Sequence, residues 1–161
     1  MATLSDVKKS IGEVLSYFPS NINYLKNLLT SINSISSSKL DNLYFELEVN
    51  EIVVADFVSL IMQVHNITSV ELHIFFSEPN NQMVEYINKG LGISSSISEM
   101  MMIVDMLIEV YILMSYMEDG SRFDENVSHE MLYPFTGEIN DFMQESEKMV
   151  ELLKRYNNML R

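Results

Sequence analysis

The sequence contains no cysteine and no tryptophan, and only 5 glycines and 3 prolines occur among its 161 residues. Without cysteine the chain has no disulfide and no thiolate for catalysis or metal binding, which fits a reducing, cytoplasmic location. The sequence also lacks HExxH, GxSxG, P-loop and Gly-rich dinucleotide-binding motifs. We therefore expect no catalytic residue, no cofactor and no bound metal, and we predict that the protein is not an enzyme.

Basic residues are scarce: 10 Lys and Arg stand against 23 Asp and Glu, which gives a formal net charge of −13. Between residues 40 and 121 there are 13 acidic residues and one basic residue, Lys89. Binding to nucleic acid or to an anionic membrane requires clustered Lys and Arg, so neither partner is expected. An acidic surface of this extent instead attracts a basic surface on a partner protein.

The start of the chain lacks the apolar run of a secretory signal. The most hydrophobic window, residues 100–117, contains Asp105 and Glu109, which are costly inside a bilayer. We predict a buried core helix for this window, in a helix that runs from the capping box at Ser96 to about residue 118.

Other segments also show helical spacing of apolar residues. Residues 5–18 predict a helix that Pro19 ends, and residues 20–32 predict a second one, so that residues 1–39 form a helical hairpin. Residues 80–89 predict a helix that ends at Gly90. An acidic connection over 119–136 then precedes a last helix over 136–161, which has Ser146 at one of its apolar positions.

The apolar spacing changes to every second residue in 43–49 and again in 70–76, which predicts two strands. The helical pattern between them, over 51–64, has the length of a parallel crossover. The predicted fold is therefore α+β: a mostly helical single domain of residues 1–161, with a small parallel β-α-β unit packed against N-terminal and long C-terminal helices. Its parts are the helical hairpin of residues 1–39, the β-α-β-α unit of residues 40–90, and the long helices of residues 94–161 with their acidic connection.

The two predicted strands are offset by 27 residues, and this offset would set their register. One face of the sheet would then combine carboxylates with aromatic rings, and we expect it to bind the partner protein. The residues of this predicted partner-binding set are Tyr44, Glu46, Glu48, Glu71, His73 and Phe75.

Methionine is abundant, with 13 residues, and many of them fall in the helix predicted over 96–118. Because methionine adapts to irregular surfaces, such a cluster is compatible with plain core packing and with an interface. The residues of this predicted interface are Met101, Met102, Met106, Met114 and Met117.

Three functions remain open from the sequence. The first is a non-enzymatic regulatory protein that docks on a basic surface of a partner, as an inhibitor or nucleic-acid mimic. The second is a structural subunit of a homo-oligomer or larger assembly. The third is a metal-dependent hydrolase, in which the helical carboxylate pairs Asp105/Glu109 or Asp141/Glu145, with His129, would hold the ion.

Overall fold

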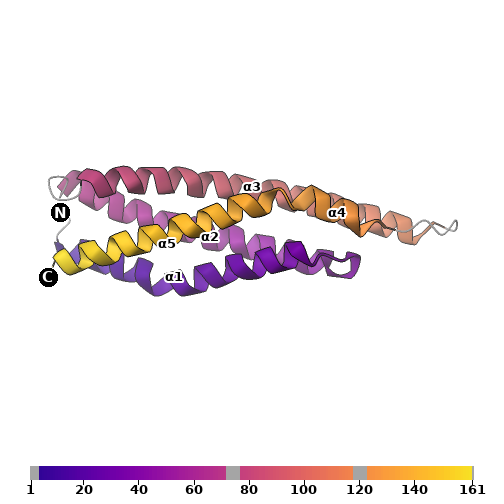
Figure 1. The fold of residues 1–161 in the computed structure, drawn as a ribbon, viewed down its shortest axis with the longest axis horizontal. Coiled ribbons are helices and arrows are strands. Elements are labelled where there is room, and N and C mark those ends of the chain that lie inside the picture. Colours follow the sequence, from indigo (N-terminus) through magenta and orange to yellow (C-terminus); the bar gives the residue numbers. More distant parts are fainter. Residues whose placement is uncertain (1–3, 72–76, 118–122, 161) are drawn as a thin grey trace.

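The structure, a computed structural model, describes residues 4–71, 77–117 and 123–160. Every regular element in these ranges is helical: α1 (Leu4–Asn33), the short 3₁₀ turn η1 (Ser37–Lys39), α2 (Leu40–Glu71), α3 (Ser77–Ser115), α4 (Glu125–Leu132) and α5 (Phe135–Met159). Figure 1 shows α1, α2, α3 and α5 side by side with alternating direction, as an elongated bundle. The start of α1 and the end of α5 lie at the same end of the bundle.

Each long helix places an apolar stripe of period 3 and 4 toward the bundle axis. In α1 this stripe contains Val7, Ile11 and Val14, and it continues through Leu25, Leu28 and Ile32. The corresponding stripe of α5 contains Ile139, Phe142, Met149 and Leu153, as the sequence predicts. Burial of these faces, rather than intrinsic helix propensity, stabilises helices of this kind.

A layer of aromatic rings crosses the middle of the core and connects all four long helices. Phe18 of α1 contacts Phe57 of α2 with ring centroids 6.2 Å apart, and Phe57 contacts Tyr86 of α3 edge-on at 6.0 Å. Tyr86 then stacks on Phe142 of α5 at 5.2 Å. Because each helix contributes one ring, this layer fixes the relative register of the helices.

The predicted β-α-β unit is wrong in the part of the chain that the structure describes. Residues 43–49 lie within α2, where Leu43 and Leu47 are buried one turn apart, whereas Phe45 is 64% exposed. The alternating pattern therefore contains a helical i, i+4 pair, and the neighbours Leu40 and Val54 extend that pair into a core stripe. Of the second predicted strand, residues 70–71 belong to α2, and residues 72–76 lie outside the described ranges. The fold class is all-α.

Two predicted helix ends are also wrong. Pro19 lies inside α1, so residues 4–33 form one helix instead of a hairpin. Proline removes one backbone hydrogen bond there, but Val14 and Ile22 on either side of it are both buried, and this packing maintains the helix. Gly90 likewise lies inside α3 and does not end a helix. A Cβ on it would clash with Cγ2 of Val58 in α2, so glycine permits the close approach of the two helices. The helix start predicted at Ser96 is wrong as well, because Ser96 also lies inside α3.

The last part of α3 projects beyond the turn that connects α1 and α2 (Figure 1). Leu107 is the last buried residue of α3, so the predicted burial of residues 100–117 holds only for their first half. The short helix α4 packs near this projecting part. Glu125 of α4 fixes its position by accepting hydrogen bonds from the backbone N–H (2.9 Å) and Oγ (3.1 Å) of Ser37 in η1. Within the described ranges, no helix has both the length and the apolar character needed to cross a membrane.

Candidate functional site

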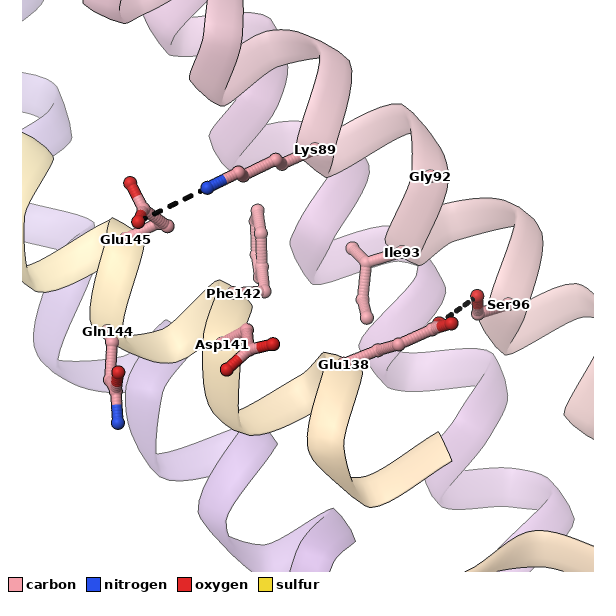
Figure 2. A pocket seen from close by; sticks show the side chains of 9 residues that line it. All are labelled: Lys89, Gly92, Ile93, Ser96, Glu138, Asp141, Phe142, Gln144 and Glu145. Carbon is pink, nitrogen blue, oxygen red and sulfur yellow. Dashed lines mark hydrogen bonds and ion pairs between the residues drawn. The ribbon is translucent and has the colours of Figure 1, made fainter. Parts of the chain in front are cut away.

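A groove of about 360 Å³ lies between α3 and α5 (Figure 2). Ile93 and Phe142, both buried, form its apolar base, and polar side chains stand around them. Gly92 borders it on α3, where nothing lies within 4 Å of the position a Cβ would take. The groove is therefore open at the backbone of α3 and polar around its rim.

Two polar bridges between α3 and α5 stand on either side of this groove, as Figure 2 shows. Lys89 pairs with Glu145 at 3.2 Å, and Ser96 donates a hydrogen bond to Glu138. Burial by itself would raise the pKa of Glu145, but the hydrogen bond and charge of Lys89, together with Lys148, lower it below its ordinary value. Glu145 is thus a carboxylate at neutral pH.

Between the two bridges, Asp141 has no ion pair or hydrogen bond to any residue that the structure describes. The groove has three carboxylates, those of Glu138, Asp141 and Glu145, and one ammonium group, that of Lys89. This charge favours a cationic group. The described ranges nevertheless contain no set of three His, Cys, Asp or Glu side chains placed to hold a metal ion.

The predicted partner-binding set is not brought together, because the sheet that would gather it is absent from the described residues. Tyr44 is half-buried against the core, Glu46 is half-buried and Glu48 is exposed, all near the start of α2. Glu71 is the last residue of the same helix, about 40 Å from Tyr44 at the rise of an α-helix. His73 and Phe75 lie outside the described ranges. As a partner-binding set these residues remain a prediction.

The carboxylate pairs considered for metal binding lie apart from one another. Asp105 and Glu109 are exposed on the outer face of α3, and Asp141 and Glu145 lie at the α3–α5 groove. His129 is half-buried in α4, where its ring contacts Tyr133 at 5.3 Å. The described side chains therefore give no support to a hydrolase built on these pairs.

A more extensive surface feature is found on α3. Its outer face carries large apolar side chains that no described residue covers: Met102 is 75% exposed, Leu113 67% and Tyr116 81%. Helical spacing of four, eleven and fourteen residues from Met102 places Met106, Leu113 and Tyr116 on its side of α3, opposite the buried Met100 and Val104. We name this surface the α3 stripe; its residues are Met102, Met106, Ile112, Leu113, Tyr116 and Met117.

Three members of the α3 stripe, Met102, Met106 and Met117, belong to the interface predicted from the sequence. The other two predicted interface residues, Met101 and Met114, are half-buried. The sequence-based prediction missed Ile112, Leu113 and Tyr116 because it considered methionine alone. The available signal was that residues 100–117 contain no charged residue besides Asp105 and Glu109.

The charge around the α3 stripe is of one sign. Asp105 and Glu109 lie on the same face of α3, and Glu125 and Glu130 are exposed on the adjacent helix α4. Between residues 90 and 121 the sequence contains no Lys or Arg. Helical spacing places Asp105 and Glu109 among the residues of the α3 stripe, so the surface is apolar and carries two carboxylates within it.

Comparison with protein-family models, with curated proteins and with solved structures finds no match for this chain.

Proposed function

We propose that this protein is a non-enzymatic binding protein that docks, through the α3 stripe, on an apolar surface of a partner protein flanked by Lys and Arg. The observation that carries the proposal is the uncovered apolar face of a helix that projects from the bundle. Single exposed apolar residues are ordinary, whereas several of them on one face of a helix are typical of an interaction site.

The length of the stripe fits a protein partner. From Met102 to Ser115, where α3 ends, the helix rises about 20 Å, which is long enough to pack along a helix of about four turns. Burying side chains such as Leu113 and Tyr116 would supply the association free energy, because the hydrophobic effect scales with the apolar area removed from water. Tyrosine, present here as Tyr116, is enriched among the residues that dominate binding energies at interfaces.

The charge argues for a different protein as partner rather than a second copy of the chain. Self-association through the α3 stripe would bring Asp105 and Glu109 of one copy close to the same carboxylates of the other, with no Lys or Arg among residues 90–117 to balance them. A partner with Lys and Arg beside its apolar residues would instead form complementary pairs. This reasoning favours a regulatory binding protein over a homo-oligomeric subunit.

A labelled amphipathic peptide of about 18 residues, with leucines on one face and lysines on the other, tests the surface chemistry by fluorescence anisotropy. We expect Leu113→Asp/Tyr116→Asp to weaken binding by at least about tenfold. The matched control is Phe45→Asp/Ile52→Asp, which changes two exposed apolar side chains of α2 in the same way.

The choice of aspartate separates docking from general charge attraction. Both variants add two negative charges, so a purely electrostatic interaction with a basic peptide would become tighter in both. Loss of binding in the α3 variant alone supports docking on the α3 stripe, and unchanged or tighter binding in that variant overturns it. Sedimentation equilibrium of the protein alone tests whether a second copy of the chain covers the α3 stripe instead. If the protein forms a dimer and Leu113→Asp dissociates it, a second copy replaces the proposed partner.

A further inference from the structure

A second pocket, of about 590 Å³, opens between α1 and α2, on elements that the α3 stripe does not include. It lies next to Pro19, around Ser20, whose small side chain leaves room at the surface of α1. The buried ring of Phe57 forms part of its base. The pocket is therefore apolar underneath and open to solvent.

Two tyrosines stand at this pocket, one on each side of Ser20 along α1. Tyr17 and Tyr24 are 57% and 43% exposed, and neither makes a ring contact or hydrogen bond with another described residue. Seven residues of helix separate them, which is about 10.5 Å along the axis. The pocket, of about 590 Å³, has room for a methylated ammonium group beside these rings.

The charge at the pocket is negative. Asp56 of α2 and Glu13 of α1 both line it, and neither carboxylate has an ion pair among the described residues. Among the residues that the structure describes, no Lys or Arg lines it. Aromatic faces attract cations through the ring quadrupole, and nearby carboxylates add Coulomb attraction. The tyrosines give the site a selectivity for organic cations that carboxylates alone would lack.

We propose that the α1–α2 pocket binds an organic ammonium group, held between Tyr17 and Tyr24 with Asp56 as the counter-charge. Such a group occurs on small quaternary amines and on methylated lysine side chains, and both present the same chemistry to the site. The inference is independent of the partner proposed for the α3 stripe, because it rests on other helices and another class of ligand.

Isothermal titration with choline, and with its uncharged isostere 3,3-dimethylbutan-1-ol, tests the inference. The two probes have nearly the same shape and differ in charge. We expect choline to bind at least about fivefold more tightly than the alcohol. Equal affinity for the two probes, or no binding of choline, would overturn the site.

Substitutions in the full-length protein then assign the roles of the side chains. Tyr17→Phe retains the aromatic face and should bind choline within about threefold of the wild type, whereas Tyr17→Leu should weaken binding by at least about fivefold. Asp56→Asn should weaken it similarly. Phe45→Leu, which removes an exposed ring outside both proposed sites, is the control. If Tyr17→Leu binds choline with the affinity of the wild type, the contact between the cation and the Tyr17 ring is contradicted, although choline still binds.

A pair of peptides distinguishes the two sources of the ligand. One contains trimethyl-lysine and the other lysine in the same sequence. Tighter binding of the methylated peptide than of choline assigns the site to a modified protein, and tighter binding of choline assigns it to a small amine. Either result supports the proposed chemistry. If the lysine peptide binds as well as the methylated one and neither depends on Tyr17, general charge attraction explains the binding and the proposal fails.

Discussion

The hydroxyl oxygen of Tyr86 lies 2.7 Å from Oγ of Ser146 in the buried contact between α3 and α5. Ser146 donates its own proton to the carbonyl of Phe142 at 2.8 Å, so Tyr86 is the donor of the bond to Ser146. Burial raises the pKa of Tyr86 well above its ordinary value, although the hydrogen bond with Ser146 acts to lower it. The phenol therefore remains protonated and can keep donating.

This direction of donation predicts unequal effects of two small deletions. Ser146→Ala leaves the buried Tyr86 hydroxyl without an acceptor and should lower the free energy of unfolding by about 1–3 kcal/mol. Tyr86→Phe leaves Ser146 bonded to Phe142 and should cost only about 0.5–1.5 kcal/mol. Urea denaturation of both variants and of the double variant measures this order. A larger loss in Tyr86→Phe than in Ser146→Ala would contradict the assigned direction.

Gly90 and Gly92 provide a second matched pair. A Cβ at position 90 meets Cγ2 of Val58, whose side chain is stiff in a helix, so Gly90→Ala should destabilise the protein by about 1–3 kcal/mol. A Cβ at position 92 meets nothing, so Gly92→Ala should stabilise it by about 0.5–1 kcal/mol through helix propensity.

Thermal unfolding of the two glycine variants checks that Gly90→Ala lowers the stability and that Gly92→Ala raises it. Adding Val58→Ala to Gly90→Ala removes the clashing methyl groups, and the double variant should lose less stability than the sum of the two single variants. Equal effects at positions 90 and 92 would mean that α2 and α3 are not in close contact at Gly90.

The bridge between Lys89 and Glu145 predicts a dependence of stability on pH. The pKa of Glu145 in the folded chain lies below its ordinary value of 4.5, so the stabilisation is present above that value and is lost as the pH falls through the folded pKa. At about pH 7, Glu145→Gln should cost about 0.2–1 kcal/mol, as a surface pair does. At about pH 2 the wild type and the variant should be equally stable. If the wild type is still more stable than Glu145→Gln in acid, the loss of stability in the variant comes from packing and not from the ion pair.

Much of the helical content could be predicted from the sequence because burial follows the 3.6-residue period closely. Val7, Ile11 and Val14 in α1, and Ile139 and Leu153 in α5, are buried as their spacing indicates. Ser146 was identifiable as a polar residue at an apolar position, but its partner Tyr86 is 60 residues away along the chain. Such a pairing depends on the register of two helices, which no local pattern contains.

The errors share one physical cause, which is that tertiary packing overrides local signals. Residues 43–49 alternate, but Leu43 and Leu47 are buried together on one helical face. Pro19 is a local helix breaker, yet the buried residues on both sides of it continue the helix.

Only part of the α3 stripe could be predicted, for a related reason. Periodicity indicates a helix that is apolar over most of its circumference, but it does not indicate which side faces the other helices. In the structure Leu113 and Tyr116 lie on the side opposite the buried Met100 and Val104, so they face away from the bundle. Their exposure depends on how the helices pack against one another.

The central claim is that the α3 stripe is covered by a basic partner, and site-specific photo-crosslinking tests it most directly. The crosslinker p-benzoylphenylalanine would replace Leu113 in one protein and Phe45, on α2, in a control, both expressed in the native host. We predict an adduct at position 113 with a different protein that has clustered Lys and Arg, weakened at high salt, and no such adduct at position 45. Adducts only with a second copy of the chain, the same adducts at both positions, or none at position 113 would contradict the claim.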